Sequence, residues 1–156
     1  MVSVLFVCLG NICRSPTAEA VFARDVKAAG LDSAIEIDSA GTGDWHAGER
    51  AHPPTRALAA ERGIEITHRA RQITRGDLTR FDYVIVMDRS NLANVLALTK
   101  SEVERAKVRL FRELEEDAES DEVPDPYYSG QFAEVFEICE RASAGWLAHV
   151  RDKHGI

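Results

Sequence analysis

Apolar runs and segments with helical spacing alternate along the chain, and this alternation predicts its secondary structure. The segment Val2–Val7 is apolar at nearly every position, as expected for a parallel strand that is buried on both faces. Shorter runs of the same kind predict strands at about residues 35–39, 83–87 and 107–111. Because helical segments separate these strands, the pattern favours an α/β fold in three layers, a parallel sheet with helices on both faces.

Four segments repeat apolar residues three and four positions apart, which is typical of amphipathic helices. They are residues 17–29, 53–62, 89–98 and 132–150. In the last segment, Cys139 and Trp146 fall on the apolar face and are expected in the core. His149 and His154 are expected on the surface.

Length and composition describe one ordinary globular unit. The 156 residues suit a single domain that spans residues 1–156, with 45% hydrophobic and 29% charged residues. A net charge of −7 argues against a nucleic-acid partner, and no apolar stretch approaches the roughly 20 residues that cross a membrane. The chain lacks the pattern of a signal peptide, and its three cysteines form no disulfide framework. We expect a cytoplasmic protein and a monomer.

The candidate chemistry is concentrated in the segment Cys8–Ser15, which follows the first strand. A glycine-containing loop that leads into a helix directs unpaired backbone N–H groups and the positive end of the helix dipole at one point. This arrangement holds a tetrahedral oxyanion and favours a thiolate at Cys8. Arg14 offers a fork of donors to two phosphate oxygens, and Ser15 offers a hydroxyl to the departing sulfur. The segment predicts phosphoryl transfer to a cysteine; alternatively, Cys8 merely ends a buried strand.

A second motif places a carboxyl group between two prolines. Pro124 and Pro126 fix the backbone around Asp125, so that its side chain has a constrained direction. In isolation, such a segment is read as a turn whose carboxylate accepts a local hydrogen bond. In a chain that also carries a cysteine nucleophile, Asp125 supplies the general acid that the reaction needs.

The segment Cys8–Pro16 resembles the phosphate-binding loop of the low-molecular-weight protein tyrosine phosphatases, and Asp125-Pro126-Tyr127 resembles their general-acid loop. The order of the two motifs and the elements between them extend the resemblance over essentially the whole chain. It implies a four-stranded parallel sheet in the order 2-1-3-4, and hydrolysis of phosphotyrosine through a phosphocysteine at Cys8. The residues implied in phosphate binding are Leu9, Gly10, Asn11, Ile12, Cys13, Arg14 and Ser15.

The resemblance also implies supporting and rim positions. Ser39 would support the anion loop from the small-residue segment Ser39–Gly43, although turn chemistry alone fits that segment equally well. His68 would hydrogen-bond Asn11 and so hold the strained loop, although a lone histidine is more often a structural group. Ser15 would assist the leaving sulfur. The side chains expected around the substrate ring are Ile12, Trp45, Tyr127 and Tyr128.

The implied partners follow from the same reaction. We expect phosphotyrosine-containing proteins as substrates and inorganic phosphate as product, with no cofactor and no metal, because the arginine and the amides supply the positive charge. His46 and His52 lack partners at metal-ligand spacing and are expected to be exposed. Cys13 suggests redox control, since it would trap an oxidised Cys8 as a reversible disulfide.

Several charged positions have simpler interpretations. Arg71 and Arg75 are read as surface charge, and Asp88 as the N-cap of the helix that follows it. The segment Glu113–Glu122 holds seven acidic residues and predicts a mobile, solvated loop.

Three other functions fit parts of the pattern. An arsenate reductase on a related scaffold needs further cysteines in mid-chain, and none lies between Cys13 and Cys139. A protein arginine phosphatase also resembles this chain, but that branch carries a threonine where Ile12 stands. A non-catalytic phosphopeptide-binding module would not need the nucleophile, the arginine and the acid together.

Overall fold

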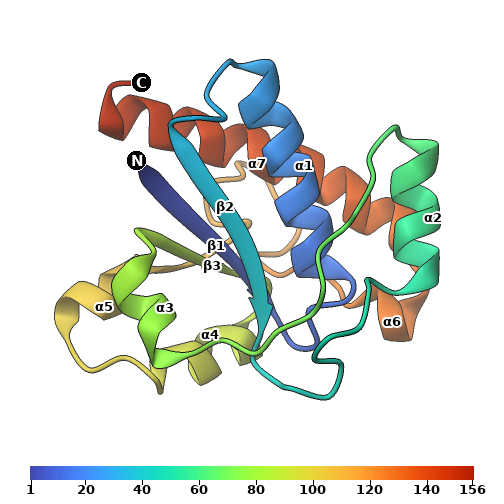
Figure 1. The fold of residues 1–156 in the computed structure, drawn as a ribbon, viewed down its shortest axis with the longest axis horizontal. Coiled ribbons are helices and arrows are strands. Elements are labelled where there is room, and N and C mark those ends of the chain that lie inside the picture. Colours follow the sequence, from blue (N-terminus) through green and yellow to red (C-terminus); the bar gives the residue numbers. More distant parts are fainter.

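The computed structural model describes residues 1–156 and contains four strands and seven helices (Figure 1). The strands are β1 (Val2–Cys8), β2 (Ile35–Gly41), β3 (Tyr83–Val86) and β4 (Val108–Leu110). The helices are α1 (Arg14–Ala28), α2 (Pro53–Glu61), α3 (Arg75–Arg80), α4 (Arg89–Leu96), α5 (Glu102–Lys107), α6 (Pro126–Ser129) and α7 (Phe132–His154). All neighbouring strands are parallel, in the order β2-β1-β3-β4, so the predicted fold class and strand order are confirmed.

Helices cover both faces of the sheet, as Figure 1 shows: α1 and α7 lie on one side, and α3, α4 and α5 lie on the other. The side chains of β1 alternate between the two faces. Val4 and Phe6 join a large apolar cluster with α1 and α7, whereas Leu5 and Val7 join a smaller cluster with α3 and α4. Because both faces of β1 are buried, nearly every residue of this strand is apolar.

The strand β2 is longer than the sequence predicts. Ser39, Ala40 and Gly41 belong to the strand, and they pair in register with Phe6, Val7 and Cys8 of β1. The predicted strand, at about residues 35–39, therefore ends two residues too early, because the parallel ladder continues through Ala40 and Gly41. The short helices α3, α5 and α6 were not predicted, since helices of four to six residues are too short to show a periodicity.

The last helix closes the core as expected, with one exception. Cys139 and Trp146 are fully buried, and the indole N–H of Trp146 donates to the carbonyl of Phe111 at 2.8 Å. His154 is exposed, but His149 is half-buried, with its ring centroid 5.3 Å from that of Trp146. The predicted surface position of His149 is therefore wrong, because the apolar face of α7 is wider than its strictly apolar residues indicate.

The acidic segment Glu113–Glu122 is engaged with cations. Glu113 pairs with Arg109 at 2.7 Å, and Glu115 pairs with Arg112 at 2.9 Å. The expectation of a fully solvated run is wrong for these two carboxylates, because the arginines that precede them on β4 and in the turn after it fold back onto them.

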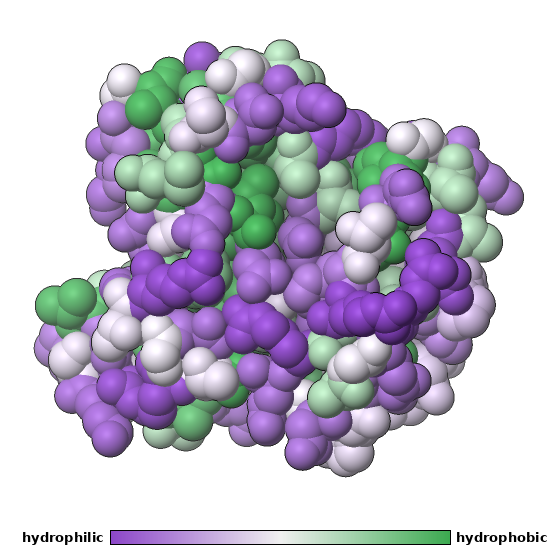
Figure 2. Space-filling model, in the orientation of Figure 1, coloured by the Kyte–Doolittle hydropathy of each residue, from purple (hydrophilic) through white to green (hydrophobic).

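The surface carries most of the remaining charge. The face over α1 and β2 in Figure 2 is predominantly hydrophilic, with apolar residues scattered in small groups. No helix combines the length and the apolar character that crossing a membrane requires.

Candidate active site

The loop between β1 and α1 lies at the carboxyl end of the sheet, where open α/β folds place their sites. Cys8 is the last residue of β1 and is 3% exposed. Its Sγ lies 3.0 Å from Ser15 Oγ and accepts a hydrogen bond from the backbone N–H of Asn11 at 3.3 Å. The fifteen-residue helix α1 begins at Arg14, so the positive end of its dipole points at the same loop. The hydrogen-bond contacts and the helix end therefore converge on the sulfur.

Asn11 holds the loop in a left-handed backbone conformation, with φ of 58°. Asparagine adopts this conformation more readily than most residues. Its side-chain amide donates to Ser15 Oγ at 2.8 Å and to Ser39 Oγ at 3.0 Å. Its side-chain oxygen accepts from His68 Nε2 at 2.8 Å and from the backbone N–H of Arg71 at 3.0 Å. Four hydrogen bonds of the Asn11 side chain therefore hold the loop, and the expected contact between His68 and Asn11 is present.

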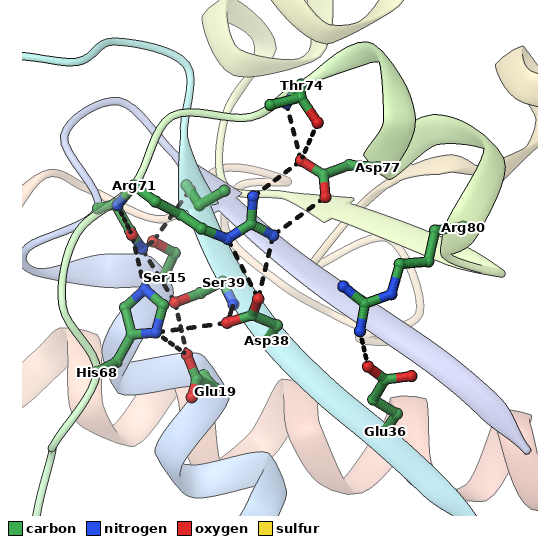
Figure 3. Close-up of polar contacts among 12 residues, drawn as sticks. Ser15, Glu19, Glu36, Asp38, Ser39, His68, Arg71, Thr74, Asp77 and Arg80 are labelled. Carbon is green, nitrogen blue, oxygen red and sulfur yellow. Dashed lines mark hydrogen bonds and ion pairs between the residues drawn. The ribbon is translucent and has the colours of Figure 1, made fainter. Parts of the chain in front are cut away.

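Two carboxylates behind His68 complete a cluster that the sequence did not indicate (Figure 3). His68 Nδ1 lies 3.3 Å from Glu19 Oε1 and 3.4 Å from Asp38 Oδ1, and Ser39 Oγ donates to Glu19 at 2.6 Å. The proton of the neutral His68 ring lies on Nε2, which donates to Asn11. A hydrogen bond between Nδ1 and the carboxylates therefore requires a second proton. Burial raises the pKa of Glu19 to about 7, so this proton is retained below neutral pH.

Glu19, Asp38 and His68 are also the candidate metal ligands of the chain, because their ligand atoms lie within 4.8 Å of one another. Each of the three already has a protein partner: Ser39 for Glu19, Arg71, at 3.1 Å, for Asp38, and Asn11 for His68. The hydrogen bonds account for this cluster as a support of the loop, and we assign no cation to it.

Arg71 is part of this support, contrary to its interpretation as surface charge. Its guanidinium contacts Asp38 of β2 at 3.1 Å and Asp77 of α3 at 2.9 Å (Figure 3). Arg75 also pairs within the fold, with Glu104 at 2.7 Å. The prediction is wrong for Arg71, because its pairs join distant segments that a local pattern does not connect. The Arg75 side chain is 39% exposed and lies at the surface as predicted, although it is paired.

Arg14 is 2% exposed and lies between two carboxylates. Its Nη1 donates to Asp88 Oδ2 at 2.7 Å, and its Nη2 lies 3.5 Å from Asp125 Oδ2. Burial disfavours the charged guanidinium, but the nearby Cys8 sulfur and these carboxylates outweigh it and raise the pKa of Arg14. Asp88 also accepts from the backbone N–H of Asn91 at 2.7 Å, so its predicted N-cap role is confirmed but incomplete.

Asp125 precedes α6 and uses its two oxygens differently. Oδ1 accepts from the backbone N–H of Tyr127 at 3.1 Å, whereas Oδ2 faces Arg14. The side chain is 25% exposed and lines the same cleft as Cys8. The predicted local turn contact is therefore made by Oδ1, whereas Oδ2 is the oxygen that faces the site.

The predicted nucleophile, arginine and acid line one cleft of about 240 Å³. The loop residue Ile12 forms part of its wall, and three largely exposed aromatic side chains stand around it. These side chains are Trp45, which follows β2, and Tyr127 and Tyr128 of α6. The structure thus brings the predicted rim residues to the predicted phosphate loop.

One histidine contributes to this wall and a second packs behind it, and neither was predicted to do so. His46 lines the cleft and packs over Gly10, where an added Cβ would lie 3.1 Å from His46 Cδ2. The His52 ring centroid lies 5.1 Å from that of Tyr127, and the His52 backbone N–H donates to the carbonyl of Ile12 at 2.8 Å. Both histidines are half-buried, so the expectation of exposed positions is wrong.

Cys13 also lines the cleft but differs from Cys8 in its surroundings. It is 4% exposed, and burial raises the pKa of its thiol to about 12. Cys13 is therefore protonated at neutral pH.

A parallel α/β sheet whose first loop presents a buried cysteine and an arginine, opposite a carboxyl group, defines the class of cysteine-dependent phosphatases. The comparisons with known proteins identify the family within this class. Residues 3–155 match the family described as low molecular weight phosphotyrosine protein phosphatase, and the chain belongs to this family.

Individual relatives agree with this assignment. A low molecular weight protein-tyrosine-phosphatase of Streptomyces coelicolor is 47% identical over 154 residues, which cover 96% of this chain and 94% of the relative. The crystal structure of YfkJ from Bacillus subtilis matches with a TM-score of 0.95 and 39% identity, over 98% of this chain and 96% of that one. A Drosophila arginine phosphatase structure matches with a TM-score of 0.87 and 30% identity, over 95% of this chain and 97% of that one.

Proposed function

We propose that this chain hydrolyses phosphotyrosine monoesters in proteins, with Cys8 as the nucleophile and a phosphocysteine as the intermediate. The observation that carries the proposal is that Cys8, Arg14 and Asp125 line one cleft with an aromatic rim. Membership of the family supports phosphotyrosine proteins as the substrate class.

In the first step, the Cys8 thiolate attacks phosphorus, and the S–P bond forms as the bond from phosphorus to the tyrosine oxygen breaks. Asp125, in its protonated form, gives its proton to the departing oxygen, so that tyrosine leaves neutral. Arg14 and the backbone N–H groups of the loop hold the equatorial phosphate oxygens, on which negative charge redistributes.

In the second step, water attacks phosphorus and the P–S bond breaks, which releases inorganic phosphate. Asp125, now ionised, accepts the proton of the water. Ser15 Oγ, 3.0 Å from the sulfur, donates a hydrogen bond as the thiolate leaves. Asn11, held by Ser39 and His68, keeps the donors of the loop in place, so that they need not reorganise during the reaction.

The rim gives the cleft its preference for an aromatic ester. The rings of Trp45, Tyr127 and Tyr128 offer faces and edges against which a tyrosine ring packs. A phosphoserine is too short to reach these rings while its phosphate lies in the loop, so it gains only the phosphate contacts.

The first test is steady-state hydrolysis of a phosphotyrosine peptide beside phosphoserine and phosphoarginine, with a reductant and a metal chelator. We expect turnover of phosphotyrosine alone. A preference for phosphoarginine would mean that Ile12 does not exclude a guanidinium. The chain would then act as an arginine phosphatase, which is how the similar Drosophila structure is named. Saturable phosphopeptide binding without turnover would favour a binding module.

Two variants test the assigned roles. Cys8→Ser should abolish turnover and retain phosphate binding, since the loop remains; full activity of this variant would refute the mechanism. Asp125→Ala should lower kcat for phosphotyrosine about 10²–10⁴-fold, and less for an ester whose leaving group is more acidic. Equal losses for both leaving groups would contradict the role of Asp125 as an acid.

We further propose redox control of a cytoplasmic, monomeric enzyme. A peroxide would oxidise the Cys8 thiolate to a sulfenic acid, and the Cys13 thiol would displace water from it to form a disulfide. Both cysteines line the same cleft, and neither is paired in the structure. Mass spectrometry after mild peroxide should detect a Cys8–Cys13 linkage that dithiothreitol reverses and that Cys13→Ser lacks.

A further inference from the structure

The indole of Trp45 lies directly on the backbone of Gly43. A Cβ added to Gly43 would lie 1.9 Å from Cζ3, 2.3 Å from Cε3 and 2.6 Å from Cη2 of Trp45. These distances are far below the contact distance of carbon atoms, so the ring occupies the space that any side chain at position 43 would fill.

The backbone of Gly43 does not itself demand glycine. Gly43 is absent from the glycines with positive φ, which are Gly30, Gly48, Gly63, Gly130 and Gly155. A left-handed backbone therefore does not exclude a side chain at this position. The three atoms nearest to a Cβ at this position all belong to the Trp45 ring.

The backbone at Gly43, on which the Trp45 ring rests, is fixed relative to the phosphate loop. The backbone N–H of Gly43 donates to the carbonyl of Leu9 at 3.0 Å, and that of Thr42 donates to the carbonyl of Cys8 at 2.9 Å. Trp45 itself is 68% exposed, and its ring lies against Gly43. The distance of the indole from the loop is therefore set through Gly43.

The ring also separates two hollows. Trp45 and Leu9 line both the active-site cleft and a second hollow of about 320 Å³, which Thr42, Gln72 and Leu98 line on its other sides. A shift of the indole by one or two ångströms therefore changes the width of the cleft mouth on one side and of this hollow on the other.

We propose that Gly43 is a positioning residue that seats the Trp45 indole at the mouth of the cleft and thereby sets the affinity for the aromatic ring of the substrate. The inference rests on the proposed function for the identity of that ring. Gly43 touches no reacting atom, so its replacement acts on KM and leaves the chemistry of Cys8 and Asp125 intact.

A comparison with Gly41 shows why Gly43 can be tested without unfolding the protein. A Cβ at Gly41 would lie 2.8 Å from the carbonyl oxygen of Leu9 and 3.2 Å from the backbone nitrogen of Asn11, which are fixed backbone atoms of the loop. A Cβ at Gly43 meets the far end of one exposed side chain, which can turn away. We therefore expect Gly43→Ala to keep the thermal stability of the wild type.

The experiment is a double-mutant cycle of Gly43→Ala and Trp45→Ala, with steady-state kinetics on a phosphotyrosine peptide. Gly43→Ala should raise KM about three- to tenfold and keep kcat within about twofold, because the lost contact is one aromatic pair. In the Trp45→Ala background, Gly43→Ala should change KM by less than about 1.5-fold. Gly76→Ala is the matched control, since its Cβ meets only Thr74 Oγ1, at 3.6 Å, and KM should not change.

Fluorescence gives a second readout that does not depend on activity. The chain has two tryptophans, and Trp146 is fully buried, so a difference spectrum against Trp45→Phe reports Trp45. Gly43→Ala should shift the Trp45 emission, and Gly76→Ala should not.

The proposal would be overturned by an unshifted Trp45 emission, by an unchanged KM despite a shifted emission, or by a rise in KM that persists without Trp45. A fall in both kcat and melting temperature would also overturn it, by showing a structural role. A wild-type chain that does not hydrolyse phosphotyrosine would refute the proposed function and the KM effect, and the emission comparison would then decide on the seat alone.

Discussion

At the scale of single residues, Asn11 holds much of the phosphate loop in its conformation. Its φ of 58° strains a residue such as alanine, and its side chain makes four hydrogen bonds. Asn11→Ala loses these bonds and keeps the unfavourable backbone, so we expect the free energy of unfolding to fall by about 3 kcal/mol. Chemical denaturation measures this change.

Asn11→Gly separates the two causes. It loses the same hydrogen bonds but tolerates the left-handed backbone, so it should be about 1 kcal/mol more stable than Asn11→Ala. Equal stability of the two variants would contradict the contribution of backbone strain. Both variants should lower kcat, since the loop loses its supports in each.

At the scale of elements, Arg71 joins β2 to α3 through Asp38 and Asp77. Asp77 is 5% exposed, and removal of its partner leaves a buried carboxylate without a counter-charge. We expect Arg71→Met to lower the free energy of unfolding by about 2 kcal/mol, between the values typical of exposed and of fully buried pairs. Urea denaturation is the measurement.

Arg80 provides the control for this prediction, because it pairs with Glu36 of the same strand β2 at an exposed position (Figure 3). Arg80→Met should change the free energy of unfolding by no more than about 0.5 kcal/mol. If the two variants lost equal stability, burial of the pair would not be the cause.

At the scale of the whole molecule, the cluster of Glu19 and His68 makes stability depend on pH. The pKa of Glu19 is raised from 4.5 to about 7 in the folded chain, so the folded form holds a proton that the unfolded form releases at lower pH. The resulting stabilisation is fully present below pH 4.5 and is lost as the pH rises through about 7. We expect the free energy of unfolding, relative to Glu19→Gln, to decrease by about 2–3 kcal/mol between pH 5 and pH 8.

The comparison with Glu19→Gln removes from this measurement the titrations of groups that do not contact Glu19. Burial lowers the pKa of His149, which has the opposite effect, since its contribution to stability is lost as the pH falls below its ordinary pKa of 6.5. His149 is present in both proteins, so its effect cancels in the difference. Parallel pH profiles of the two proteins would show that Glu19 titrates as in the unfolded chain.

The sequence by itself indicated the strands, their parallel direction and the main chemical groups of the predicted site, whereas the strand order came from the family resemblance. Apolar runs and the spacing from Cys8 to Arg14 are properties of residues that are close in the chain, so they can be recognised without knowledge of the structure. Asp125 was found in the same way, because two prolines constrain it locally.

Only the tertiary structure decided what supports these groups. Arg14 and Asp88 are 74 positions apart in the chain, and Arg71 and Asp38 are 33 apart. The role of Gly43 likewise depends on where the Trp45 ring comes to rest. A periodic pattern reports which face of an element is buried, but the partner across a contact is set by how the elements pack, and that is fixed only when the sheet and its helices assemble.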